Sequence, residues 1–262
     1  MFRRARQAGR RRRFGPNDPL PEPDDGFDFS DDDEDDPDEG PDGGLLAAAE
    51  EFSARTGVRL FAAIPDDDEE DVETQEAKGP VEARVGMRAM PVIGRAIMMY
   101  PTTIRGGLLR QLHLYGRFRM RGIPFLGCAQ PKRARINLAI RRKTPPGQLQ
   151  ETLHHEIGHL IEMHPDFPAG RWEALNSHPY LGQGHRDREG KFRGEAVWSQ
   201  GFISRYASKN RHEDFAELVE VAFTEPRRAH QLAREYPVIG AKLAFLDDTY
   251  ARFAPGMSLP WR

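Results

Sequence analysis

The sequence predicts an α+β fold, because two kinds of segment occupy different parts of the chain. Short β-prone runs, separated by Gly and Pro, fill residues 81 to 140. A long amphipathic helix is indicated from residue 144, and from Asn210 onward the apolar residues have helical spacing. This order is typical of a small mixed sheet followed by a helical C-terminal part.

The predicted strands are partly alternating runs of apolar and polar residues. They lie in VEARVGMRAM (81–90), AIMMYPTTI (96–104), LHLYGRF (112–118) and ARINLAI (134–140). Upstream, GLLAAAEEFSARTGVRLFAAIP (44–65) predicts a short helix and then a strand.

The central helix should begin with Thr144 as its N-cap and Pro145 in its first turn, and Pro165 should end it. Its apolar stripe consists of Leu149, Leu153, Ile157, Leu160 and Ile161. Residues 165–205 are rich in Gly, Pro, His and Trp and predict a long irregular segment. Three helices are expected after it, at 212–223, 226–236 and 237–253.

Charge divides the chain into three parts. Residues 1–43 join an arginine cluster to a dense aspartate block, which predicts a disordered, acidic N-terminal extension. Residues 44–80 hold the short helix and strand and an acidic linker, and residues 81–262 are the expected compact domain. Residues 1–80 carry a net charge of −14, whereas residues 81–262 carry +11.

Several protein classes are excluded by simple features. Cys128 is the only cysteine, so an internal disulfide is impossible. The N-terminal arginines are followed by no apolar segment of a secretory signal, and no apolar run approaches the roughly 20 residues of a membrane span. We expect a soluble protein that is cytoplasmic rather than secreted.

The stretch LHHEIGHLIEMH (153–164) holds four histidines and two glutamates. Within it, His155, Glu156 and His159 form the pattern HExxH, which places two imidazoles on one helix face at the spacing that binds one Zn²⁺. A solvated helix that is rich in histidine is the alternative. His154 has glycine at i+4, and we expect it at the surface or behind the metal ligands.

A catalytic zinc site needs a third protein ligand. The extended pattern HExxHxxGxxH is not present, because position 162 is Glu and position 165 is Pro. His164 would point away from the helix face of the motif. The remaining candidates are His178, His185, Glu213, Glu217 and Glu220.

The block SRYASKNRHEDFAELVEVAF (204–223), following HHEIGH, resembles a pattern of gluzincin-type zinc metallopeptidases. These relate to the catalytic domain of anthrax lethal factor and to bacterial zinc-binding metallopeptidases. The resemblance implies a zincin-like domain with one Zn²⁺ held by His155, His159 and Glu213. It also implies that Tyr206 faces the reacting carbonyl and that Glu217 lies behind the ligands.

Both of these assignments have a structural alternative. Asn210 and Glu213 also fit a capping box, which would place a glutamate there for helix stability alone. Tyr206 could be a buried aromatic residue.

The activity implied by the resemblance is that of a metalloendopeptidase. Zinc would lower the pKa of a bound water toward about 7, Glu156 would take the proton of that water, and Tyr206 would stabilise the oxyanion. The substrate would be a protein or peptide, lying as an added strand against residues 135–140.

Residues 84–143 hold 14 basic residues and no acidic one. They could form a solvated arginine-rich surface, contact the chain's own acidic segments at 18–43 and 66–76, or bind nucleic acid. The alternative function is therefore a non-catalytic or nucleic-acid-associated interaction protein that uses this basic surface.

Overall fold

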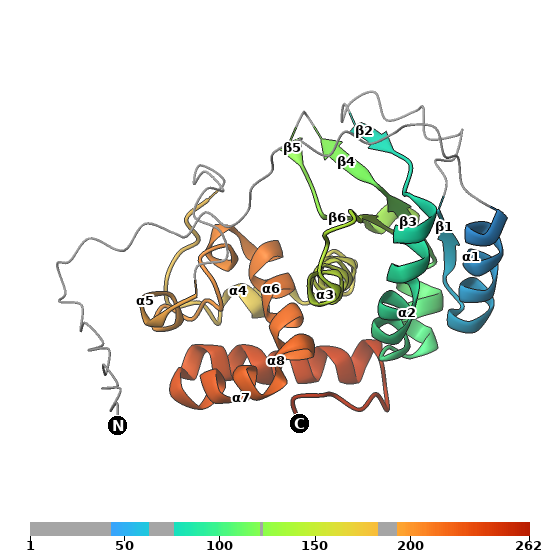
Figure 1. The fold of residues 1–262 in the computed structure, drawn as a ribbon. Helices are drawn as coiled ribbons and strands as arrows, with labels where there is room; N and C mark the ends of the chain where they lie inside the picture. The colour runs from blue at the N-terminus through green and yellow to red at the C-terminus, as the bar shows by residue number, and fades with distance from the viewer. Residues whose placement is uncertain (1–42, 63–75, 121–122, 183–192) are drawn as a thin grey trace, which may run out of the picture. The chain divides into compact units, whose positions relative to one another are not determined.

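The computed structural model describes residues 43–62, 76–120, 123–182 and 193–262 (Figure 1). The predicted disorder of the N-terminal extension and most of the acidic linker lie outside these residues. The strands are β1 (Arg59–Phe61), β2 (Glu76–Gly79), β3 (Gln111–Tyr115), β4 (Arg117–Met120), β5 (Ile123–Pro124), β6 (Gly127–Gln130) and β7 (Arg135–Ala139).

One helix precedes the strands, one lies between β2 and β3, and the others follow β7. The helices are α1 (Gly43–Thr56), α2 (Ala83–Met98), α3 (Pro146–Glu162), α4 (Ala169–Glu173), α5 (Glu195–Trp198), α6 (Arg211–Thr224), α7 (Pro226–Glu235) and α8 (Pro237–Phe253). Shorter turns are the π-helical η2 (Thr103–Leu108) and the 3-10 turns η3 (Pro131–Arg133) and η5 (Ala207–Lys209).

Four strands form a mixed sheet in the order β1-β3-β7-β6. β1, β3 and β7 are parallel, whereas β6 runs antiparallel to β7. A smaller antiparallel sheet has the order β2-β4-β5. The predicted α+β class, with a small mixed sheet and a helical C-terminal part, is confirmed. Because β1 pairs with β3, residues 59–61 belong to the same sheet as the later strands.

The two faces of the larger sheet contact different partners. Leu112, Leu114, Ile136 and Leu138 join one hydrophobic core with residues of α2 and α3. Tyr115 and Ala139, which are offset by one residue, pack instead with Phe118 of β4. Alternating strand residues thus fill two cores.

The prediction of strands at 81–90 and 96–104 is wrong, because these segments form α2 and η2. Val85, Ala89, Ile93 and Ile97 recur every four residues and are all buried, which is a helical period. Pro91 and Gly94 lie between the two predicted strands, but both are within the helix. The strand expected at 134–140 is confirmed as β7, whereas the run 112–118 is divided between β3 and β4, which belong to different sheets.

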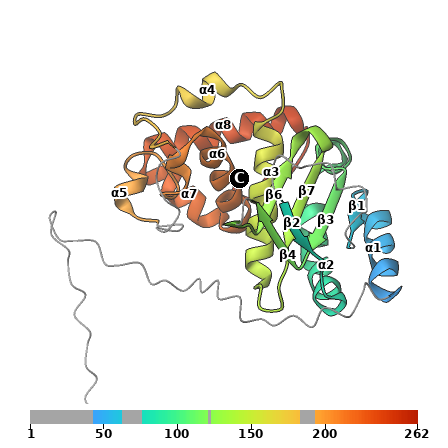
Figure 2. The same cartoon turned by 90° about the horizontal axis from the view of Figure 1, so that it is seen from above.

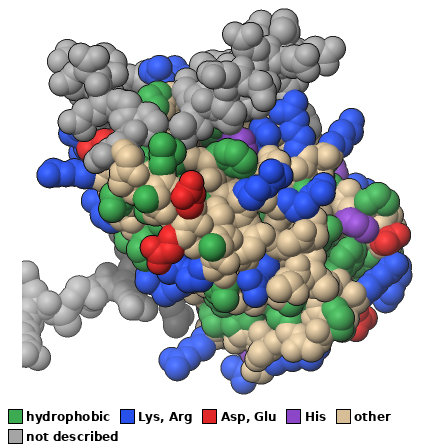
Figure 3. Space-filling model, turned by 90° about the vertical axis from the view of Figure 1, so that its right-hand side faces the viewer, with side chains coloured by type: hydrophobic (Ala, Val, Ile, Leu, Met, Phe, Trp, Pro, Cys, Tyr) green, Lys and Arg blue, Asp and Glu red, His purple; other side chains and the backbone are tan. Residues whose placement is uncertain are grey.

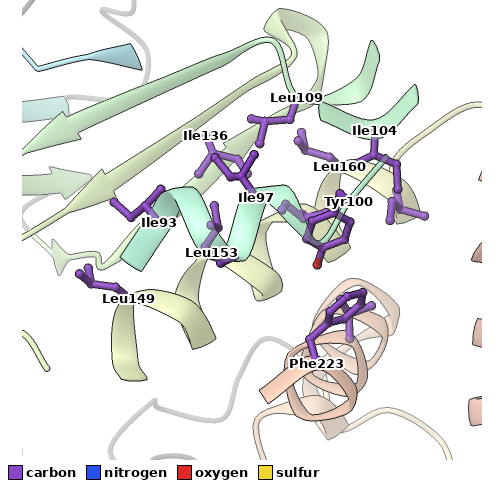
Figure 4. Packing of buried hydrophobic residues seen from close by; sticks show 14 of the residues in the cluster. Ile93, Ile97, Tyr100, Ile104, Leu109, Ile136, Leu149, Leu153, Leu160 and Phe223 are labelled. Atoms are coloured by element: carbon purple, nitrogen blue, oxygen red, sulfur yellow. The ribbon is translucent and has the colours of Figure 1, made fainter. Parts of the chain in front are cut away.

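Helix α3 lies between the larger sheet and α6 (Figures 1 and 2). Figure 4 shows Leu149, Leu153 and Leu160 of α3 beside residues of α2 and Ile136 of β7. The start predicted for α3 is corrected, because Pro146 begins the helix and Pro145 is its N-cap. The Thr144 hydroxyl instead accepts a hydrogen bond of 2.9 Å from the Arg141 N–H and closes the preceding turn.

The expected substrate strand must also be corrected. β7 is hydrogen-bonded on both sides, to β3 and to β6, so its backbone cannot accept a further strand. Among the described residues, β6 is the strand at the edge of the sheet next to α3. A period-two pattern identifies a strand but does not say whether it is internal.

The three C-terminal helices are confirmed as α6, α7 and α8. The irregular segment before them contains the short helices α4 and α5. No helix among the described residues is long and apolar enough to cross a membrane.

Candidate metal centre

The HExxH residues lie on the side of α3 that faces α6. Leu153 and Ile157 are fully buried in the core, and His155, Glu156 and His159 project from the neighbouring helix face. Gly158 allows the close approach of α6, because a Cβ atom there would lie 2.9 Å from the Cα atom of Ala216.

The structure brings His155, His159 and Glu213 together. The Oε2 atom of Glu213 lies 3.2 Å from Nε2 of His155 and 3.5 Å from Nε2 of His159. One donor atom from each of the three side chains lies within 4.8 Å of the others. Two turns of one helix and the first turn of another thus supply two imidazole nitrogens and one carboxylate oxygen.

Helix α6 presents Glu213 through its N-terminal cap. The Asn210 side chain accepts a hydrogen bond of 3.0 Å from the Glu213 N–H, as a capping residue does. The carboxylate of Glu213, however, contacts the two histidines and Tyr206. The capping interpretation therefore explains Asn210, whereas the Glu213 side chain belongs to the site.

The opposite nitrogen of His155 faces two buried carboxylates. Its Nδ1 lies 3.5 Å from Oε1 of Glu217 and 3.3 Å from Oε2 of Glu220. Carboxylates at Nδ1 favour a proton there and leave Nε2 available for a metal ion. Glu217 and Glu220 lie on this side of His155, away from His159, so neither replaces Glu213 as the third donor.

The side chain of Glu156 extends from α3 toward the edge strand β6. A Cβ atom at Gly127 of β6 would lie 2.7 Å from Oε1 of Glu156, so only glycine fits there. The Ala129 backbone also hydrogen-bonds to Glu156. Burial raises the pKa of Glu156, against the opposing influence of His159 and His155.

Tyr206 approaches the site from the segment before α6. Its hydroxyl donates a hydrogen bond of 3.1 Å to Oε1 of Glu213, and its ring centroid lies 6.2 Å from that of His155. The hydroxyl thus lies beside the three donor groups.

Opposite charges within the cluster stabilise the ionised forms of Glu213 and His155. Burial alone raises the pKa of Glu213, but its contacts with His155 and His159 outweigh burial and hold that pKa far below its ordinary value. Burial lowers the pKa of His155, whereas the carboxylates of Glu213, Glu217 and Glu220 raise it well above its ordinary value. The site therefore carries excess negative charge that suits a cation.

The other histidines considered from the sequence lie elsewhere. His154 is buried, so the surface position considered for it is wrong: its Nδ1 lies 2.7 Å from the Tyr100 hydroxyl, and burial lowers its pKa to about 4. His164 contacts Asp166, and His178 is exposed beside Ser177. His185 lies outside the described residues.

Glu220 was considered from the sequence only as a third ligand. Arg193 and Ser204 hold the carboxylates of Glu220 and Glu217, respectively. Ser204 is the first residue of the block 204–223, but no role was expected for it, and no periodicity or motif indicates the contact of Arg193.

The donor set fits Zn²⁺. Two imidazole nitrogens and one carboxylate oxygen, with a carboxylate behind a ligating histidine, are the groups that catalytic zinc sites use. The arrangement can hold a divalent cation between α3 and α6, with Glu156 and Tyr206 at its side.

Comparison with known proteins agrees with this chemistry. The model of the family described as "Putative zinc-binding metallo-peptidase" matches residues 137–242. A crystal structure described as a putative zinc-binding metallo-peptidase from Bacteroides caccae shares the fold, with a TM-score of 0.55 and 13% identity over 85% of this chain and 90% of that chain. No curated protein matches. The resemblance inferred from the sequence is confirmed: residues 137–242 of this chain match the zinc-binding metallo-peptidase family.

Proposed function

We propose that this protein is a zinc-dependent endopeptidase whose metal ligands are His155, His159 and Glu213. The observation that carries the proposal is the convergence of their three donor atoms within 4.8 Å of one another. The family match supports the same chemistry. These residues come from two helices that are more than 50 positions apart in the sequence, so a chance histidine-rich helix does not account for them.

Bound Zn²⁺ supplies Lewis acidity, which activates water and polarises a carbonyl group. Glu156 accepts the proton of the attacking water and passes it to the leaving amine, because its carboxylate adjoins both histidines. Tyr206 donates its hydroxyl hydrogen to the oxygen that gains charge at the scissile carbonyl. In the structure the Tyr206 hydroxyl donates to Oε1 of Glu213 at 3.1 Å, beside the three proposed ligands.

We propose that the peptide substrate pairs with the outer edge of β6. β6 lies at the edge of the described part of the sheet, and Ala129 of this strand hydrogen-bonds to Glu156. A peptide added there would pass Glu156 with its backbone held in register. The outer edge of β6 thus leads to the proposed catalytic group.

Zinc content and peptide cleavage test this function together. Wild-type protein should retain one Zn²⁺ after dialysis, and His155→Ala and Glu213→Ala should lose it. Glu156→Gln should retain zinc but cleave no peptide in a library that the wild type cleaves. Wild-type protein that holds no zinc after reconstitution would refute the proposal, whereas zinc retention by Glu213→Ala would remove Glu213 from the ligand set.

We propose nucleic-acid association as a second candidate function, because the basic residues between 84 and 143 give the surface a positive charge. None of the basic residues between 84 and 143 that the structure describes is buried, and Arg84, Arg88 and Arg95 are exposed along α2. Figure 3 shows a face with more Lys and Arg side chains than Asp and Glu side chains. The chain's own acidic segments at 18–43 and 66–76, nearly all of which lie outside the described residues, are the alternative partner that we propose for this surface.

A further inference from the structure

The buried carboxylate of Glu220 links His155 to a distant arginine. Its Oε2 atom lies 3.3 Å from Nδ1 of His155, and its Oε1 atom lies 3.3 Å from Nη2 of Arg193. The Arg193 guanidinium also contacts Glu225 at the end of α6. One arginine therefore contacts the C-terminal half of α6 at two places, and one of these contacts leads to His155.

Glu217 has an equivalent arrangement one turn earlier. The Ser204 hydroxyl donates a hydrogen bond of 2.7 Å to Oε2 of Glu217, and Oε1 of Glu217 lies 3.5 Å from Nδ1 of His155. Ser204 is itself fixed, because its oxygen accepts the Ala207 N–H at 3.0 Å. Each carboxylate thus has one oxygen held by the segment before α6 and the other oxygen directed at His155.

We propose that Glu220 and Arg193 are positioning residues for His155. Together they hold the imidazole ring so that Nδ1 carries the proton and Nε2 faces Glu213 and His159. This inference rests on the proposed zinc-binding function. It assigns to Arg193, which has no contact with the metal ligands, a role in the strength of metal binding.

Arg193 is needed because two carboxylates share one imidazole nitrogen. Glu217 and Glu220 have fully buried side chains, and two negative charges so close to one N–H group repel each other. The Arg193 side chain is 28% exposed and brings a permanent positive charge to Glu220. Without the contact of Arg193, the Glu220 carboxylate would no longer be held at Oε1 and would turn away from Nδ1, so the ring of His155 would lose one support.

Arg193 also offers a matched control. Its second partner, Glu225, is 42% exposed and follows the last residue of α6. Glu225→Gln removes one charged contact of Arg193 but leaves the path through Glu220 intact. A general loosening of the segment would affect both partners of Arg193, whereas of these two partners only Glu220 contacts His155.

The test measures zinc affinity of the full-length protein by competition with a chromophoric chelator. We expect Glu220→Gln and Arg193→Ala to weaken zinc binding by about 10- to 100-fold, the range typical of residues behind a metal-ligating histidine. Arg193→Lys, which keeps the positive charge, should recover part of this loss. Glu225→Gln should bind zinc as the wild type does.

A second measurement detects the imidazole proton directly. In zinc-saturated protein with ¹⁵N-labelled histidine, the Nδ1–H signal of His155 should move upfield in Glu220→Gln and Arg193→Ala, because its acceptor is weakened. Glu225→Gln should leave this signal in place. Should Glu220→Gln fail to fold, both measurements can still be made on Arg193→Ala, because the Arg193 side chain is partly exposed.

The possible failures can be told apart. If Glu213→Ala loses zinc while Glu220→Gln and Arg193→Ala bind it like the wild type, the positioning role is wrong and the proposed function stands. If Glu225→Gln weakens zinc as much as Arg193→Ala does, the effect is general and the inference is also overturned. If the wild type itself binds no zinc, the proposed function fails and this inference fails with it.

Discussion

The Cα atom of Ala216 lies so close to Gly158 that a Cβ atom at position 158 would stand 2.9 Å from it. The Cβ atom of Val219 would be only 3.3 Å away. The backbones of α3 and α6 therefore lie close together at the point where α3 carries the two histidines and α6 carries the glutamates of the site. The short separation of the helices is what allows the Glu213 carboxylate to lie 3.2 Å from His155.

Gly158→Ala should therefore push the two helices apart. We expect it to lower the free energy of unfolding by about 1–3 kcal/mol, as overpacking does, and to weaken zinc binding. Gly147→Ala is the control, because Gly147 lies in the first turn of the same helix with open space around it. Urea denaturation measures the free energy of unfolding of both variants. Equal stabilities of the two variants would contradict the packing argument.

Tyr206→Phe should separate catalysis from metal binding. Loss of the hydroxyl should lower kcat by about 10²- to 10³-fold, the range for one donor to an oxyanion, while zinc remains bound. Tyr180→Phe is the control, since its hydroxyl donates instead to Asp214 at 2.9 Å. Steady-state kinetics on a peptide that the wild type cleaves gives both values. An unchanged kcat in Tyr206→Phe would leave Tyr206 as a packing residue.

The buried pair of Lys242 and Asp214 should be important for stability. Lys242 Nζ lies 2.8 Å from both carboxylate oxygens of Asp214 and also donates to the Gly201 carbonyl at 2.8 Å. Lys242→Met leaves the Asp214 charge buried without its partner, so we expect a loss of about 3–5 kcal/mol in the free energy of unfolding.

The double variant Lys242→Met with Asp214→Asn should lose less than Lys242→Met alone, because the buried charge is gone. Thermal and urea denaturation of the three proteins measure this difference. A double variant that is less stable than the single one would show that the Asp214 carboxylate stabilises the fold through its other partner, the Tyr180 hydroxyl at 2.9 Å, and would contradict the argument from a buried unpaired charge.

Charge reversal on α2 tests the basic surface. If the surface binds nucleic acid, Arg84→Glu with Arg88→Glu should weaken retention on immobilised DNA and reduce its dependence on salt, because fewer phosphate contacts form. The double variant Arg227→Glu with Arg234→Glu carries the same change of net charge on exposed positions of α7. Equal losses in the two double variants would show a net-charge effect and no defined surface.

Removal of residues 1–42 tests whether the acidic extension competes with DNA for the basic surface. If it occupies the basic surface, the truncated protein should bind DNA more tightly than the full chain. Retention that does not change would contradict this intramolecular contact.

The sequence by itself indicated the candidate metal-binding residues of this protein. HExxH on a helix requires only a local period, so His155 and His159 could be placed on one face before any fold was known. The resemblance of residues 204–223 to a known block then indicated Glu213 and Tyr206. Helices α3 and α6 to α8 and strands β3 and β7 also follow from local periodicity.

Tertiary structure decided how these groups are arranged. The segments 81–90 and 96–104, which were predicted as strands, belong to α2 and η2, and their buried residues, such as Val85 and Ile97, join one core with residues of α3 and the sheet. The position of β7 inside the sheet, and of β6 at its edge, depends on pairing between distant segments. The contacts of Arg193 and Ser204 with the glutamates behind His155 likewise join residues that no local period relates, because side chains meet across helices only once the core has formed.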